Sequence, residues 1–153
     1  MIRKTTERNS LDLVSELRRE QSRWEAAVRC DDDLAVEQAA EHGDALLNAL
    51  VISEEGRTAL ENMLSDDSPG LRLGVAAKVV NWAPDKAIPI LARLLYEDFD
   101  PVVAPWEGAG VRMNARLLLM KYFGLDEPMP LPIRLAAMGL QLPKWLSREL
   151  SRE

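Results

Sequence analysis

Residues 68–124 read SPGLRLGVAAKVVNWAPDKAIPILARLLYEDFDPVVAPWEGAGVRMNARLLLMKYFG, and this stretch decides the fold. Ser68 can accept a hydrogen bond from the free N–H groups of a first helical turn, and Pro69 suits the position that follows such a cap. Apolar residues then recur at helical spacing, and no segment alternates convincingly as a strand does. The stretch predicts an all-α protein whose helices in this region span residues 69–82, 84–96 and 111–123.

A repeat is visible within the same stretch. The Leu-Arg pair at residues 71–72 returns as Val-Arg at residues 111–112, a spacing of 40 residues that is the repeat length of HEAT and armadillo helical arrays. We expect a HEAT/armadillo-like right-handed stack of antiparallel helices, about seven to eight in all. The length suits a single domain over residues 1–153, with core repeats over 53–124 and a Pro-rich C-terminal cap over 125–153 that covers the apolar end of the stack.

Three further helices are expected in the N-terminal part of the chain. The first has Ser10 as its N-cap and ends near Cys30. The turn Asp31-Asp32-Asp33 caps the second helix, and Ser53 opens the third. Gly43 in the middle of the second helix marks either a break or a close backbone crossing, of which we expect the crossing.

A loop of unusual length is expected over residues 97–110, which hold two prolines and two glycines. Loops of this length in compact domains are more often functional than incidental. Trp106 is the one aromatic residue that no helix face explains. It either packs this loop onto the domain or anchors a partner protein, because Trp is enriched among interface hot spots.

The composition limits the chemistry that the chain can perform. It has one Cys, Cys30, and one His, His42, so disulfide frameworks, zinc clusters and Cys/His relays are excluded by counting. No run of about 18 apolar residues and no signal-peptide pattern occurs. We therefore expect a cytoplasmic protein with no membrane partner.

The net charge of −6 is unevenly distributed along the chain. Residues 31–67 carry one basic and eleven acidic side chains, whereas the segments before and after them are each slightly basic. Such a concentration of negative charge attracts cationic partners and repels nucleic-acid phosphates. The charge distribution indicates a basic protein partner and no nucleic acid.

No arrangement of residues has the spacing of a known reaction site. Asp31-Asp32-Asp33 lacks the alternate ligands of a calcium loop and is better explained as a helix cap. The acidic cluster around His42 lacks the Glu-x-x-His spacing of di-iron bundles, because Ala39 stands where Glu would be needed, so we interpret it as a solvated helix face. The sequence predicts no catalytic residue, no cofactor and no metal, and we do not expect an enzyme.

Residues from about 12 to 124 resemble the domain-of-unknown-function family 2019, a small bacterial family that is itself similar to HEAT repeats. The motifs that carry the resemblance are Leu13-Val14, DDSPGLRL at 66–73 with AAK at 76–78, APDKA at 83–87 and EGAGVRM at 107–113. The resemblance implies a helical fold without assigned catalytic residues, and members of this family often lie beside bacterial toxin genes of the contact-dependent or type VI kind. The Pro-rich tail from Glu127 onward departs from the family pattern.

Two functions remain open at this point. The first is a protein-binding inhibitor, in its most concrete form an immunity protein that neutralises a basic bacterial toxin through an acidic surface. The second is a helical-repeat adaptor or regulatory subunit that binds a partner protein or peptide without catalysis. The candidate partner-binding residues are Asp32, Asp33, Glu37, Glu41, Asp44, Trp106 and Glu107.

Overall fold

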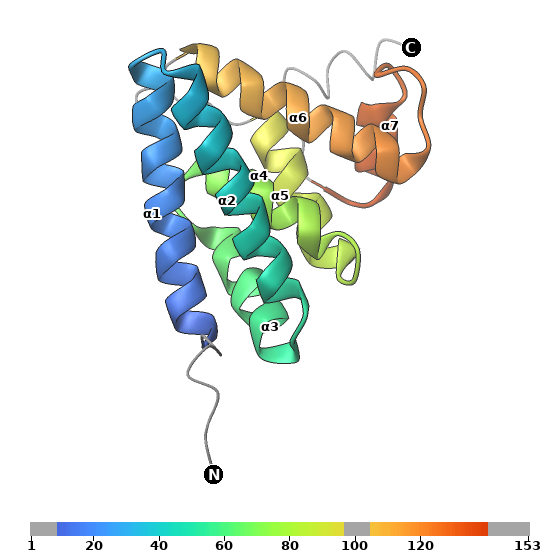
Figure 1. Ribbon diagram of the computed structural model, residues 1–153. Helices are drawn as coiled ribbons and strands as arrows, with labels where there is room; N and C mark the ends of the chain where they lie inside the picture. The colour runs from blue at the N-terminus through green and yellow to red at the C-terminus, as the bar shows by residue number, and fades with distance from the viewer. Residues whose placement is uncertain (1–8, 97–104, 141–153) are drawn as a thin grey trace. The chain divides into compact units, whose positions relative to one another are not determined.

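The computed structural model describes residues 9–96 and 105–140, with only the backbone described for residues 105–107 (Figure 1). These residues form helices and the turns between them, with no strand in the described ranges, so the all-α prediction is confirmed there. The helices are α1 (Ser10–Arg29), α2 (Asp33–Val51), α3 (Glu54–Asn62), the 3₁₀ helix η1 (Met63–Ser65), α4 (Pro69–Val79), α5 (Pro84–Tyr96), α6 (Pro105–Phe123) and α7 (Leu131–Ala137). None of the described helices is long and apolar enough to cross a membrane.

The chain forms two compact units, Met1–Val79 and Val80–Glu153, called the first and second unit below. The first unit holds α1 to α4, and the second holds α5 to α7. The boundary falls within residues 53–124, the segment expected to form one repeat core. The HEAT/armadillo stack is not confirmed, and the single domain stays a prediction.

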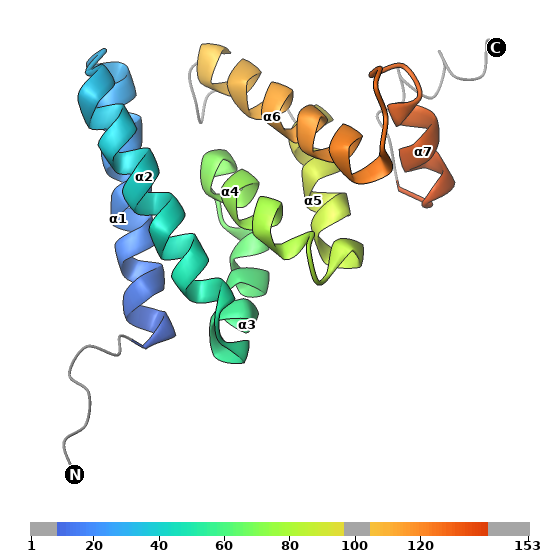
Figure 2. The ribbon, with the colours of Figure 1, turned by 45° about the vertical axis from the view of Figure 1, so that its right-hand side comes forward.

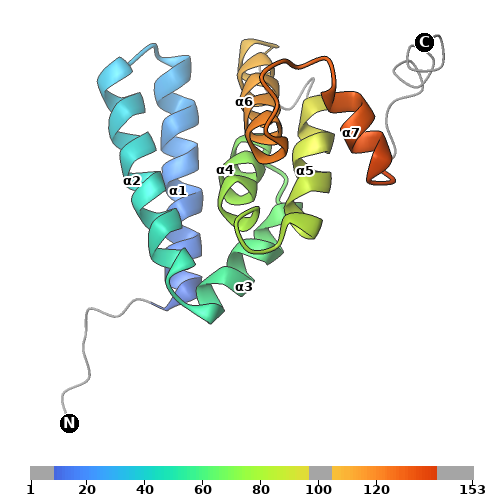
Figure 3. The same cartoon turned by 90° about the vertical axis from the view of Figure 1, so that its right-hand side faces the viewer.

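A hairpin of two long helices dominates the first unit. Helices α1 and α2 lie side by side along most of their length, as Figures 1, 2 and 3 agree. Asn9 caps α1 by accepting a hydrogen bond from the backbone N–H of Asp12 at 2.9 Å, one residue earlier than expected. In the turn, Asp31 has φ +56° and Asp32 accepts from the backbone N–H of Ala35 at 3.1 Å, so the acidic cap of the second helix is confirmed.

The hairpin packs against α3 and α4 through an apolar core, and η1 packs against the same two helices. Its buried aliphatic side chains include Leu17, Leu46, Leu47, Leu50, Leu60, Leu64, Leu71 and Val75. Each contributes about 1.5–3 kcal/mol by leaving water. Two polar contacts join α1 to the turn before α4: Arg18 Nη2 lies 2.9 Å from Asp66 Oδ2, and the Ser68 hydroxyl donates to Glu25 Oε1 at 3.4 Å.

The close backbone approach in this unit lies at Gly56 and not at Gly43. Helix α2 runs through Gly43 without a break, and a Cβ atom there would meet nothing within 4 Å, so the expected crossing at Gly43 is wrong. At Gly56 a Cβ atom would lie 2.0 Å from the carbonyl oxygen of Leu50. Only glycine fits at this position in the first turn of α3, which approaches the end of α2.

The second unit is built on the packing of α5 against α6, with α7 against α6 (Figures 1 and 3). Its fully buried side chains include Ala87, Ile88, Leu91, Leu94, Ala115, Leu119 and Leu135. Helix α5 begins at Pro84 as expected, and Pro89 lies inside it without ending it. Gly124 ends α6 with φ +67°, a conformation that glycine adopts without strain.

Two helix boundaries differ from expectation. Helix α4 ends at Val79, three residues before the expected end at Trp82. Helix α6 begins at Pro105, so the last six residues of the expected loop 97–110 are helical and the rest lie outside the described residues. Helix α7 spans Leu131–Ala137, within the segment 125–153 expected as the C-terminal cap, and residues 141–153 of that segment lie outside the described residues.

Candidate protein-interaction surface

The outer face of α2 carries a row of carboxylates, called the acidic ridge below. It consists of Asp33, Glu37, Glu41 and Asp44, all exposed to solvent. Their spacing of four, four and three residues places them on one face of the helix. At 1.5 Å rise per residue the ridge is about 16 Å long.

The ridge faces water because the opposite side of α2 is buried. Ala39, Leu46 and Leu50 lie on that side and belong to the core. Like charges four residues apart repel each other and destabilise a helix by about 0.2–0.5 kcal/mol per pair. The ridge therefore costs the isolated fold some stability, which a cationic partner would offset.

Most of the ridge is not neutralised within the protein. Lys78 Nζ of α4 lies 3.2 Å from Asp44 Oδ1, and Asn48 donates to the same carboxylate at 3.3 Å. Within the described part of the chain, no ion pair or hydrogen bond engages the side chains of Asp33, Glu37 or Glu41. These three carboxylates are available to a partner.

The other candidate residues do not belong to this ridge. The Asp32 carboxylate caps α2 and lines the hollow described below, on another side of that helix. Trp106 and Glu107 belong to the second unit, in the first turn of α6, so the expectation that Trp106 lies in a loop is wrong. A proline suits the first turn of a helix, and the glycines at 108 and 110 concealed the helix because glycine lowers helix propensity.

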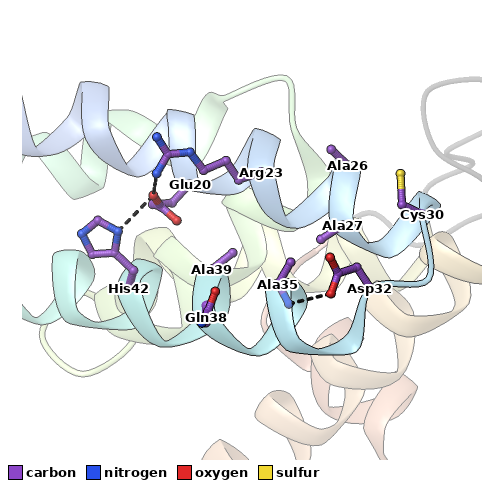
Figure 4. A pocket seen from close by; sticks show the side chains of 10 residues that line it. All are labelled: Glu20, Arg23, Ala26, Ala27, Cys30, Asp32, Ala35, Gln38, Ala39 and His42. Carbon is purple, nitrogen blue, oxygen red and sulfur yellow. Dashed lines mark hydrogen bonds and ion pairs between the residues drawn. The ribbon is translucent and has the colours of Figure 1, made fainter.

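A hollow of about 600 Å³ lies between α1 and α2 (Figure 4). Alanine side chains from both helices line much of it. The residues around it are Glu20, Arg23, Ala26, Ala27, Cys30, Asp32, Ala35, Gln38, Ala39 and His42. The hollow exists because these small side chains do not fill the space between the two helices.

One end of the hollow is closed by a charged cluster. The Glu20 side chain is only 4% exposed and pairs with Arg23. His42 Nδ1 lies 3.0 Å from Glu20 Oε1, and His42 Nε2 lies 3.1 Å from Glu16 Oε1. An imidazolium can donate from both ring nitrogens, whereas a neutral imidazole carries a single N–H. The His42 side chain is 43% exposed, as expected for a solvated face, and its ring also joins α2 to α1.

The sequence did not reveal this cluster. Glu16 and Glu20 stand one turn apart on α1, which is a visible spacing, but their partner on α2 depends on the register between two helices. No group of three or more His, Cys, Asp or Glu side chains among the described residues could hold a metal ion. The cluster ties the hairpin together, and the acidic ridge remains the best-formed candidate site.

Comparison with known proteins adds no further constraint on this site. No family model, curated protein or solved structure matches the chain.

Proposed function

We propose that the protein binds a basic protein partner through the acidic ridge. The observation that carries this proposal is the row of carboxylates at Asp33, Glu37 and Glu41, which have no ion pair or hydrogen bond among the described residues. The first unit has ten basic and sixteen acidic side chains, so it holds the whole net charge of −6, and the second unit is neutral. Charge complementarity of this kind raises the association rate and the specificity for a cationic surface.

In its most concrete form, the proposal is an immunity protein. It would act in the cytoplasm and neutralise a toxin with a basic substrate-binding surface by covering that surface. The resemblance to the domain-of-unknown-function family 2019 supports this form, as does the HEAT-like arrangement that the 40-residue spacing predicts. An adaptor that binds a basic partner without inhibiting it is the alternative, and an activity measurement separates the two.

The test reverses charge on the ridge and, separately, at a matched site. Glu37→Lys with Glu41→Lys changes the net charge by +4 in the middle of the ridge. Asp126→Lys with Glu127→Lys makes the same change at exposed residues of the turn between α6 and α7. Asp44 is left intact because replacing it would also break its ion pair with Lys78, and that effect could not be separated from the change of charge on the ridge.

Both variants are tested for protection of cells that express a candidate toxin domain with a basic substrate-binding surface. We expect the original chain and the Asp126/Glu127 variant to restore growth, and the ridge variant to fail. With purified proteins, the ridge variant should associate more slowly, with a flatter dependence on salt, because screened attraction at this face is lost. Equal protection by the two variants would move the interface away from α2, and binding without protection would favour the adaptor.

A further inference from the structure

The outer face of α6 exposes a stripe of apolar side chains. Met113 and Leu117 lie one turn apart and are 57% and 55% exposed. Ala109 extends the stripe toward the N-terminus and Met120 toward the C-terminus, at a helical spacing of four, four and three residues. The opposite face of the same helix holds the buried Ala115 and Leu119, so α6 is apolar on two sides.

This exposure differs from that of the large apolar residues in the first unit. In the described part of the first unit, Leu11, Leu34 and Ile52 are exposed, each of them at or near the end of a helix. Single exposed apolar residues are ordinary on protein surfaces, whereas a contiguous stripe in the middle of a helix is a feature of interaction sites. The stripe on α6 is of the second kind.

Positive charge flanks the stripe. Arg116 and Lys121 are exposed on its two sides, and no acidic residue occurs from Gly108 to Leu125. The α6 surface therefore combines apolar contacts along its centre with cations at its margins. A complementary surface would have an apolar centre and acidic margins.

We propose that this face of α6 binds an amphipathic helix of a partner protein that carries carboxylates on both sides of an apolar stripe. Two helices in contact bury apolar residues repeated every three or four positions. Methionine is unbranched and polarisable, so Met113 and Met120 can adapt to the side chains of such a helix. Carboxylates at the margins of the partner helix would pair with Arg116 and Lys121.

Two other occupants fit less well. An anionic membrane surface is bound by clusters of four to eight cations, whereas two cations flank this stripe among the described side chains of α6. A second copy of the chain would offer the acidic ridge, but that ridge has no apolar centre. An acidic amphipathic helix fits both properties of the surface.

The probe for the test is a fluorescent helical peptide of about 18 residues with Leu at every third and fourth position and Glu at the flanking positions. A second peptide has Lys in place of each Glu. We expect fluorescence anisotropy to show that the full chain binds the Glu peptide at least about tenfold more tightly than the Lys peptide. Equal binding of the two peptides, or no binding of the Glu peptide, would overturn the proposal.

Matched variants locate the binding face. Leu117→Ser should weaken binding of the Glu peptide by at least about tenfold, whereas Leu34→Ser, at a leucine that is 65% exposed on α2, should leave it unchanged. Arg116→Glu with Lys121→Glu should reverse the preference between the two peptides. An equal loss in the Leu34 and Leu117 variants would overturn the proposal, and unchanged helical circular dichroism shows that each variant is folded.

Two further measurements decide between occupants. If the original chain binds vesicles that contain phosphatidylserine and Leu117→Ser abolishes this binding, the stripe binds a membrane and not a protein partner. If the mass measured by sedimentation rises with protein concentration for the original chain but not for the Leu117 variant, the stripe binds a second copy of the chain. Vesicle binding below detection and a mass independent of concentration are the results expected here.

Discussion

The outer faces of α2 and α6 are both exposed, but they are stable in water for different reasons. The carboxylates of the acidic ridge are well hydrated, so α2 displays them at the small cost of mutual repulsion. Met113 and Leu117 on α6 gain nothing from hydration, and leaving them exposed forgoes the stabilisation that burial would bring. A charged face can thus serve to attract a partner from a distance, whereas an apolar face contributes only on contact. The difference predicts that salt slows association at α2, whereas at α6 salt weakens only the contribution of Arg116 and Lys121 and leaves the apolar contact in place.

The largest effect is expected within α6 itself. Leu119→Ala should cost about 2–5 kcal/mol of unfolding free energy, because Leu119 is fully buried and its loss leaves a cavity. Leu117→Ala, two residues away, should change the same quantity by less than about 0.5 kcal/mol. Denaturant unfolding of both variants measures the difference. Similar losses in the two would mean that Leu117 is buried, and would remove the contrast with α2.

A second pair of variants tests the support of the acidic ridge. Gly56→Ala should destabilise the protein by about 1–3 kcal/mol, since the new Cβ must displace the Leu50 carbonyl at the end of α2. Gly43→Ala should stabilise it by about 0.5–1 kcal/mol, because nothing obstructs a methyl group there and alanine favours the helix. Thermal unfolding of both variants checks the signs. A destabilising Gly43→Ala would mean that α2 is not continuous beneath the ridge.

The contact of His42 with α1 should matter less. His42→Gln is expected to cost about 1–2 kcal/mol, because Glu20 is buried and loses one of the two side chains that contact its carboxylate. Combining it with Glu20→Gln should cost less than the sum of the single changes, since the two side chains interact directly. A double-mutant cycle in denaturant gives the coupling. Additive losses would show that the imidazole contributes nothing to holding α2 on α1.

The smallest effect concerns a tyrosine close to the cationic margin of α6. Burial raises the pKa of Tyr96 above its ordinary value of 10.0, and the nearby charge of Arg116 lowers it in part. With Tyr122 replaced by Phe, Tyr96 is the one tyrosine left, and its phenolate absorbance should appear above about pH 10. Arg116→Gln should move this midpoint further upward, because the cation favours the phenolate.

The same shift has a consequence for stability. Above about pH 10 the unfolded chain releases the Tyr96 proton more readily than the folded chain does, so the contribution of this group to unfolding free energy falls as pH rises. Unfolding curves across that range measure the loss. A midpoint unchanged by Arg116→Gln would place this guanidinium away from Tyr96.

Sequence reasoning succeeded where the physical cause is local. Asp32, Ser53 and Ser68 were predicted as caps and accept the expected backbone hydrogen bonds, because a cap depends on residues within one turn. The bounds of α5, Pro84–Tyr96, followed from helical spacing for the same reason.

Features that depend on the tertiary arrangement were not accessible to the same reasoning. The eleven acids of residues 31–67 were visible, but which of them share one face required the bounds of α2. The pairing of His42 required the register between two helices. The apolar outer face of α6 was not identified, because a helix that is apolar on both sides gives no sequence signal of which side is covered.

The turn between α1 and α2 also bears on the order in which the protein folds. Only residues 30–32 separate the two helices, so the hairpin closes a short loop at a low entropic cost. Synthesis releases the N-terminal part of the chain first. We therefore expect the hairpin, with its acidic ridge, to fold before α6 has been synthesised. In pulsed hydrogen exchange the backbone amides of the hairpin should gain protection first. A partner that recognises α2 can then meet a nascent chain that does not yet expose an apolar stripe.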